Sequence, residues 1–223
     1  MAKLILLRHF QSQWNKDNRF AGWVDNALSR EGILQAKEVA VKLAAAKINV
    51  VYTSLLIRNQ QTVLEIFTEG FVNKYPLFIH LDSGKMQKWG NFTDTSQNDI
   101  LVYVSESLNE RYYGKLQGLN KEEIIKQYGK EKVHLWRRAF KEAPPSGESL
   151  KDVYNRVVPF YKKYIEKDLK KGKNILLVAS HNSLRALVKY IEGISDQNIA
   201  NLELPFGALR EYEFDNGKYS KYN

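Results

Sequence analysis

The chain has 223 residues, of which 43% are hydrophobic and 26% are charged, a balance typical of a folded globular protein with a sizeable core. It contains no cysteine, so disulfides, thiolate metal sites and a cysteine nucleophile are excluded. The formal charge of +9 favours anionic partners such as phosphorylated metabolites, nucleic acid or a membrane surface. A solvated lysine surface explains much of this excess equally well.

The first apolar run, residues 4–7, is too short for a signal-peptide core or a membrane span. No later stretch approaches the roughly 18 apolar residues that a span needs. We therefore expect no membrane association and a cytoplasmic location. No basic stripe interleaved with aromatic residues is evident, so we expect no nucleic-acid partner.

Three short apolar runs, at residues 3–7, 48–52 and 174–179, predict buried parallel strands. Stretches with helical spacing lie between and after them. Ser29 is a suitable N-cap for the first of these helices. Its apolar stripe consists of Ile33, Ala36, Val39, Ala40 and Leu43.

Two further helices are predicted in the second half of the chain. Ser149 and Asp152 have the spacing of a capping box ahead of an apolar stripe, and residues 183–191 also have helical spacing. Strands and helices therefore alternate. This order predicts an α/β fold with three layers, a mostly parallel sheet with helices on both faces.

Residues 70–107 form a polar, irregular segment with several glycines. Two apolar runs within it, at 77–81 and 101–104, predict strands that pair in a hairpin-like excursion. We expect residues 1–223 to form a single domain that carries this excursion, since no repeat or low-complexity tract divides the chain.

Histidines follow two of the three predicted strands. Arg8-His9 follows the first strand and Ser180-His181 the last. Ligands gather beyond the carboxyl ends of parallel strands, so we expect both histidines in one site.

An arginine beside a histidine at such an edge points to phosphate chemistry. Arg8 can grip a phosphate through two parallel charge-assisted hydrogen bonds, and a histidine beside it can attack phosphorus. Two facing histidines could instead bind a metal. We expect no metal, because Arg8 opposes a divalent cation and no carboxylate lies within a few residues of either histidine.

Residues 8–15, Arg-His-Phe-Gln-Ser-Gln-Trp-Asn, resemble the N-terminal Arg-His-Gly signature of the histidine phosphatase superfamily. Further segments resemble the cofactor-dependent phosphoglycerate mutases of that superfamily, in the same order along the chain. They are residues 18–23, 53–58, 108–121, 136–138, 144–150 and 182–190. Arg-His-Gly alone is a weak signal, whereas this ordered set is specific.

The resemblance implies a phosphoglycerate mutase-like fold and an enzyme of glycolysis and gluconeogenesis that interconverts 3- and 2-phosphoglycerate. In such an enzyme 2,3-bisphosphoglycerate would phosphorylate His9, which would then donate the phosphoryl group to either hydroxyl of a monophosphoglycerate. Glu110 would be the general acid and base, which near neutral pH requires surroundings that raise its pKa.

The resemblance also implies the other site residues. Around the transferring phosphoryl group it places Arg8, Arg58, His181, Ser12, Asn15, Gly22 and Asn182. At the far end of the substrate it places Tyr113, Lys121, Arg137 and Arg138. The implied ligands are small phosphorylated three-carbon acids, whose several negative charges suit a site with four or five cations.

The sequence departs from the family pattern beside both histidines. Phe10 stands where the family has glycine, and Asn182 follows His181 directly where the family has a glycine between them. Glycine serves where backbone must approach a ligand or adopt positive φ. We expect the two changes to be coupled, with Phe10 filling room vacated by the shorter His181 loop.

Two alternatives stay open at this point. A histidine-type phosphatase on the same fold would pass the phosphoryl group to water, and a catalytically weakened relative would keep the fold without turnover. Residues 109–121 and 136–138 favour the mutase, because they resemble the substrate-clamping segments of that family. A homodimer is compatible with the resemblance, but the sequence does not fix the oligomeric state.

Overall fold

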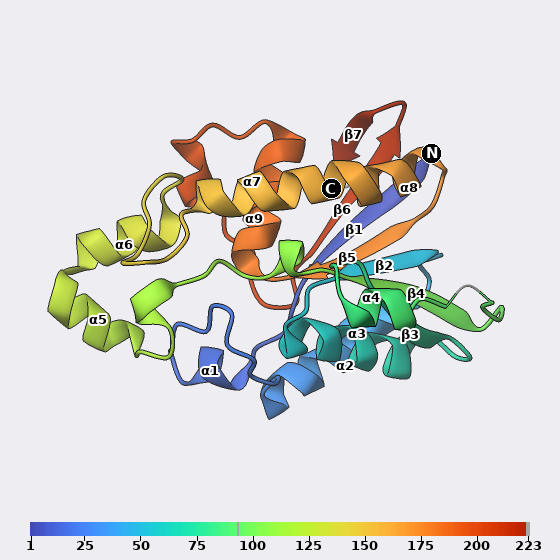
Figure 1. Ribbon diagram of the computed structural model, residues 1–223, viewed down its shortest axis with the longest axis horizontal. Coiled ribbons are helices and arrows are strands. Elements are labelled where there is room, and N and C mark those ends of the chain that lie inside the picture. The colour runs from blue at the N-terminus through green and yellow to red at the C-terminus, as the bar shows by residue number, and fades with distance from the viewer. Residues whose placement is uncertain (93, 222–223) are drawn as a thin grey trace.

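The computed structural model describes residues 1–92 and 94–221. Within them, seven strands form one sheet in the order β3-β4-β2-β5-β1-β6-β7 (Figure 1). The first five in this order are parallel, and β6 and β7 are antiparallel to their neighbours. The strands are β1 (Ala2–Arg8), β2 (Val50–Thr53), β3 (Tyr75–His80), β4 (Asp99–Val104), β5 (Ile175–Ala179), β6 (Leu209–Asp215) and β7 (Lys218–Lys221). The three strands predicted from apolar runs are therefore confirmed, within two residues at each end.

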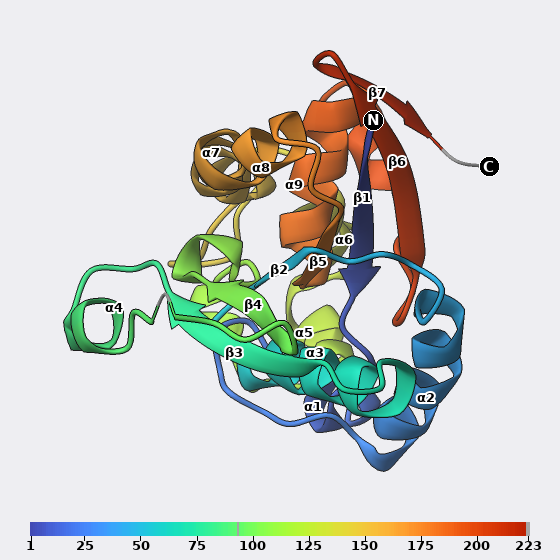
Figure 2. The same cartoon turned by 90° about the vertical axis from the view of Figure 1, so that its right-hand side faces the viewer.

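Helices cover both faces of the sheet, as predicted (Figure 2). On one face lie α2 (Arg30–Leu43) and α3 (Ile57–Gly70), and on the other α7 (Leu150–Phe160), α8 (Glu166–Lys170) and α9 (His181–Glu192). The shorter helices are α1 (Gln13–Lys16), α4 (Lys85–Trp89), α5 (Lys121–Tyr128) and α6 (Lys130–Arg138), with 3-10 turns η1 (Glu106–Leu108), η2 (Gly114–Leu116) and η4 (Asn198–Asn201). No helix in this described part of the chain is long and apolar enough to cross a bilayer.

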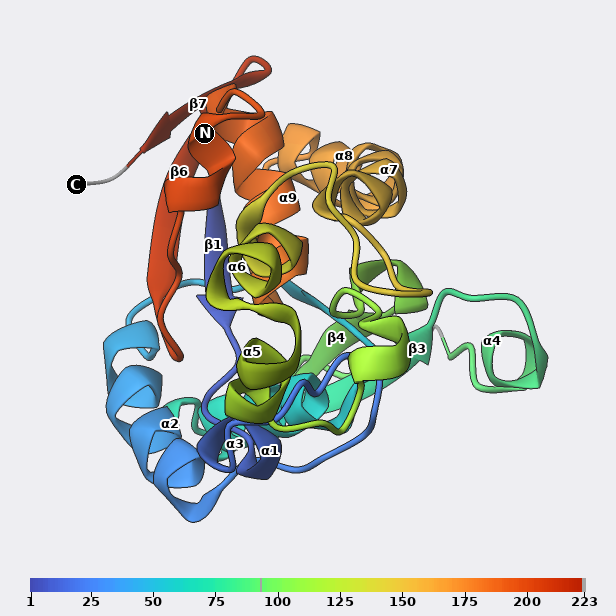
Figure 3. The same ribbon diagram turned by 90° about the vertical axis from the view of Figure 1, so that its left-hand side faces the viewer.

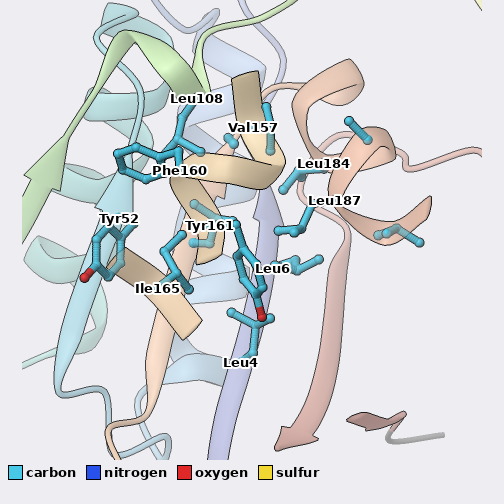
Figure 4. Packing of buried hydrophobic residues seen from close by; sticks show 14 of the residues in the cluster. Leu4, Leu6, Tyr52, Leu108, Val157, Phe160, Tyr161, Ile165, Leu184 and Leu187 are labelled. Carbon is cyan, nitrogen blue, oxygen red and sulfur yellow. The ribbon is translucent and has the colours of Figure 1, made fainter. Parts of the chain in front are cut away.

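The two faces of β1 bury alternate residues, as the two-residue period of a strand requires. Leu4 and Leu6 point to the α7–α9 face, whereas Ile5 and Leu7 point to the α2–α3 face. Figure 4 shows the first of these clusters, in which Leu6 lies near Leu187 of α9. The sheet is therefore buried on both sides, which fixes its register.

Local capping follows the sequence prediction. The Ser29 hydroxyl accepts from the Gly32 amide at 3.1 Å ahead of α2. Ser149 and Asp152 form the expected capping box ahead of α7. Beyond Pro159, the helix passes through a π-helical turn, η3 (Tyr161–Ile165), into α8.

The hairpin predicted within residues 70–107 is wrong. β3 and β4 pair in parallel from Tyr75 opposite Asp99 to His80 opposite Val104, and β4 also pairs with β2. The segment therefore supplies two strands of the main sheet, and α4 lies in the connection between them (Figure 2). The apolar runs predicted the two strands but not whether they pair in parallel or antiparallel. The connection between them is long enough for a parallel crossover.

Candidate active site

The strand exits meet at one end of the sheet. β1 and β5 are parallel neighbours with Arg8 opposite Ala179, so His9 and His181 leave the sheet side by side. Figure 3 looks onto this end, with α5 and α6 in front of the strands. A cavity of about 250 Å³ opens here. Predicted site residues that line it are Arg8, His9, Asn15, Gly22, Arg58, Glu110, Tyr113, Lys121, Arg137, Arg138 and His181.

His9 is held as a neutral imidazole. Its Nδ1 lies 2.6 Å from the Phe10 carbonyl oxygen, which can only accept, so Nδ1 carries the proton. Burial lowers the pKa of His9 well below its ordinary value, and the charges of Arg58 and Arg8 lower it further. Nε2 therefore keeps its lone pair, which is the form of histidine that can attack phosphorus.

Two arginines beside His9 retain donors for a ligand. Arg58 is 1% exposed and uses its Nη atoms on the carbonyl oxygens of Gly22 and Val24, at 2.7 and 3.1 Å. Arg8 lies with its guanidinium carbon 3.8 Å from the centre of the Phe206 ring. The buried Nε atoms of both arginines have no hydrogen-bond partner among the described residues. An anion in the cavity would supply those partners.

Ser12 does not line the cavity, contrary to its predicted role in binding the ligand directly. It is wholly buried at the start of α1, where its hydroxyl donates to Asn15 Oδ1 at 2.9 Å and accepts from the Asn15 amide. Ser12 is therefore committed to a capping box. This bonding orients Asn15, whose side chain does line the cavity.

Glu110 lies opposite the histidines and is bonded as an anion. Asn182 donates to Glu110 Oε1 through Nδ2 at 2.8 Å, and the Arg111 amide donates to the same oxygen at 2.7 Å. Burial is the largest influence on Glu110 and by itself raises the pKa. Attraction to His181 in its protonated form, these two hydrogen bonds and the charge of Arg58 outweigh it, so the pKa lies below its ordinary value.

The predicted raised pKa of Glu110 is therefore wrong for the protein without ligand, because donors and cations favour the carboxylate. The side chain of Asn182 is likewise hydrogen-bonded to other protein groups. It also donates to the Tyr113 hydroxyl at 3.2 Å and accepts from Arg185. Asn182 does not line the cavity but orients Glu110, which does.

The far end of the cavity is strongly cationic. Lys121 begins α5, and Arg137 and Arg138 end α6. Burial lowers the pKa of Lys121 to about 8, and the charges of Arg137 and Arg8 add to this effect. The depressed pKa reflects burial first and crowded like charges second, and a polyanionic ligand would relieve the repulsion between those charges.

No group of three or more His, Cys, Asp or Glu side chains that could hold a metal ion occurs among residues 1–92 and 94–221. The cavity instead combines a neutral histidine, a carboxylate and several cations. This combination suits transfer of a phosphoryl group through a covalent histidine intermediate.

Comparison with known proteins agrees with this chemistry. A sequence profile of the histidine phosphatase superfamily (branch 1) matches residues 4–89 and 92–222. The chain is 45% identical to the 2,3-bisphosphoglycerate-dependent phosphoglycerate mutase of Methanococcus vannielii, over 96% of this chain and 92% of the relative. It is 40% identical to the mutase of the same name from Protochlamydia amoebophila, over 99% of each chain. The chain belongs to this mutase family of the histidine phosphatase superfamily.

Solved structures of much lower sequence identity share the fold. A mycobacterial glucosyl-3-phosphoglycerate phosphatase superposes with a TM-score of 0.78 at 21% identity, covering 100% of this chain and 98% of that one. A protein described as mycobacterial hydrolase 1 gives a TM-score of 0.78 at 20% identity, covering 100% and 97%. At these identities the likeness shows the fold alone, which confirms the predicted three-layer α/β architecture.

The departure from the family pattern at Phe10 has a different structural basis from the one predicted. Phe10 is wholly buried in the cluster on the α2–α3 face, whereas Leu184 of the His181 helix belongs to the opposite face. A Cβ on Gly207 would lie 2.7 Å from Phe10 Cε1. Phe10 therefore packs against the Gly207 loop and does not fill room beside His181.

Two fully buried arginines behind the far end were not predicted. Arg185 donates to the Arg138 carbonyl at 2.8 Å, to the Ile199 carbonyl at 2.7 Å and to Asn182 Oδ1 at 3.0 Å. Arg111 donates to the end of α6. Arg185 thus ties the cationic end of α6 to the side chain that orients Glu110. Its position within the family-like segment 182–190 was the only sequence signal.

Two cavity residues escaped the sequence analysis, Glu203 and Phe206. Arg19, Phe20 and Ala21 also line the cavity, and they lie on the segment 18–23 that resembles the mutases. Glu203 and Phe206 belong to the loop between η4 and β6. β6 is antiparallel to β1, so the residues that precede β6 lie at the carboxyl end of β1. A search restricted to residues that follow strands cannot find them.

Proposed function

We propose that this protein interconverts 3-phosphoglycerate and 2-phosphoglycerate through a phosphohistidine at His9, primed by 2,3-bisphosphoglycerate. The single observation that carries the proposal is the neutral His9, with Nε2 unprotonated, in a cavity that has cations at both ends. A three-carbon acid with two phosphates needs two anion-binding regions. The family membership and the names of the relatives support the same substrate class.

In the first step His9 Nε2 attacks phosphorus of the donor, the new P–N bond forms, and the P–O bond to the donor oxygen breaks. Arg8 and Arg58 stabilise the negative charge on the transferring group, and the leaving oxygen takes a proton from Glu110. In the second step a hydroxyl of the bound monophosphoglycerate loses its proton to Glu110 and attacks phosphorus, and the P–N bond breaks. This second step gives 2,3-bisphosphoglycerate, and when His9 next takes the phosphoryl group from its other position, the net result is isomerisation.

The carboxylate and the non-reacting phosphate lie, in this proposal, against Lys121, Arg137 and Arg138. Burial and like charges already lower the pKa of Lys121 to about 8 and that of Arg137 below its ordinary value. A ligand anion placed among them removes that mutual repulsion, so part of the binding free energy is available to orient the three-carbon chain for both transfers.

The test is conversion of 3- to 2-phosphoglycerate by purified protein, with and without trace 2,3-bisphosphoglycerate. We expect cofactor-stimulated conversion that His9→Ala abolishes. Intact-protein mass spectrometry after addition of 2,3-bisphosphoglycerate should show one added phosphoryl group in the wild type and none in His9→Ala. His134→Ala is the matched control, because His134 is exposed on α6.

Other outcomes would change the proposal. Release of inorganic phosphate from 2,3-bisphosphoglycerate without isomerisation would establish a phosphatase. A well-folded protein that is neither phosphorylated nor active would establish a catalytically silent relative.

A further inference from the structure

Glu203 is the one carboxylate of the cavity that faces its cations from the loop before β6. Its Oε2 lies 3.3 Å from His181 Nε2, and its other oxygen pairs with Arg138. The side chain remains 55% exposed. Neither the family match nor the two-step reaction assigns this residue a role.

The side chains that Glu203 engages, His181 and Arg138, are those that a ligand anion needs. His181 Nε2 and Arg138 Nη1 are both buried and lack a hydrogen-bond partner among the described residues, although each side chain lies against the Glu203 carboxylate. The contact holds the pKa of Glu203 at about 2, chiefly through His181 and then Arg138. Glu203 is therefore an anion near neutral pH.

The surrounding loop fixes the backbone of Glu203 but not its side chain. The neighbouring Leu204 is buried, and its carbonyl accepts from Arg8 Nη1, while the Gly207 amide donates to the Arg8 carbonyl at 3.1 Å. The loop is thus pinned to the end of β1. Because the Glu203 side chain is half exposed, it can rotate into solvent without moving this backbone.

We propose that Glu203 is the site's own competing anion, which occupies the position between His181 and Arg138 in the free enzyme and yields it to an anionic group of the ligand. A phosphoryl group carries more charge and more acceptor oxygens than a carboxylate, so it can displace Glu203. As the product leaves, Glu203 returns to its contacts with Arg138 and His181. The residue therefore weakens ligand binding and speeds product release. Without Glu203, tighter binding would lower KM, and slower product release would lower kcat.

The test is calorimetric titration of the purified protein with inorganic phosphate, a probe that requires no turnover. The inference rests on the proposed function only in assuming that the ligand carries a phosphate group. The titration can therefore test it even if the protein has no mutase activity. For Glu203→Gln we expect the Kd for phosphate to fall about 1.5- to 5-fold, the range for removing one partly exposed ion-pair competitor. Glu142→Gln is the matched control, since it deletes the same charge from an exposed residue outside the cavity and should leave the Kd unchanged.

Steady-state kinetics give a second readout. Glu203→Gln should lower KM for 3-phosphoglycerate, with kcat unchanged or lower. Glu203→Asp, whose side chain is one methylene shorter, should also bind phosphate more tightly. It can replace Glu203→Gln in the test if the glutamine variant fails to fold. An unchanged Kd in folded Glu203→Gln would overturn the proposal. A raised Kd would show instead that Glu203 holds Arg138 in place for the ligand.

Discussion

The buried histidines of the site should make the stability of the protein depend on pH in a defined window. Burial is the main cause that lowers the pKa of His181 from 6.5 to about 4. In the unfolded chain this histidine takes up a proton as pH falls through 6.5, whereas in the folded protein it stays neutral until about pH 4. The unfolded state thus binds more protons in this window, so the free energy of unfolding decreases as pH falls.

The size of the effect follows from the two pKa values. The difference between 6.5 and about 4 corresponds to about 3 kcal/mol once pH is below both values, and to about 2 kcal/mol between pH 7 and pH 5. His9, whose pKa is lowered well below its ordinary value, adds a contribution of the same sign. Glu203 adds little here, because its pKa of about 2 and its ordinary value of 4.5 both lie below pH 5.

The assay is urea unfolding of wild type and His181→Asn at pH 7 and pH 5, in buffers without phosphate. We compare the change in the free energy of unfolding between pH 7 and pH 5, so the destabilisation caused by the substitution itself cancels. We expect His181→Asn to lose about 2 kcal/mol less than wild type between the two pH values. His134→Asn, at an exposed position, should behave as wild type. An equal loss in wild type and His181→Asn would refute the inference that burial keeps His181 neutral.

Three further substitutions test separate parts of the structure. Glu110→Gln should lower kcat about 10²- to 10⁴-fold with little change in KM, because it removes the proton donor and acceptor, and steady-state kinetics check this. Phe10→Ala should lower the free energy of unfolding by about 3–5 kcal/mol, since the ring is wholly buried, as measured by urea titration. Gly114→Ala should destabilise the protein by more than about 1 kcal/mol and raise KM, because Gly114 has φ +55° and a Cβ would lie 2.2 Å from the Pro145 carbonyl oxygen. A Gly114→Ala variant with wild-type stability and KM would show that this turn does not position the neighbouring Tyr113.

The parts of the fold that the sequence predicted are those whose burial leaves a local pattern. β1, β2 and β5 are covered on both faces and therefore appear as continuous apolar runs. β4 alternates between buried and half-buried residues, which indicates a strand but not its partner. Whether β3 and β4 pair in parallel depends on the path of the chain through α4, and no local pattern records that path.

For the site, too, some features could be predicted from the sequence and others could not. Most residues predicted from segments that resemble the mutases line the cavity, because the resemblance carries three-dimensional information that composition lacks. The role of a side chain that is hydrogen-bonded to another protein residue was harder to predict from the sequence. Ser12 and Asn182 were predicted to contact the ligand, yet their hydrogen-bonding groups are occupied by Asn15 and Glu110. Only the geometry distinguishes a residue that touches the ligand from one that orients its neighbour.

The same charges that prepare the site for a phosphate also hold Glu110 in the form that cannot donate a proton. Attraction to protonated His181, hydrogen bonds from Arg111 and Asn182 and the charge of Arg58 lower its pKa despite complete burial. A bound bisphosphorylated acid brings several negative charges beside Glu110 and engages those cations, which reverses the balance toward the burial effect. In the proposed mechanism we therefore expect Glu110 to become an effective acid only when the ligand is in place. This coupling explains how one buried carboxylate can serve as acid in one transfer and base in the next without a change in the fold.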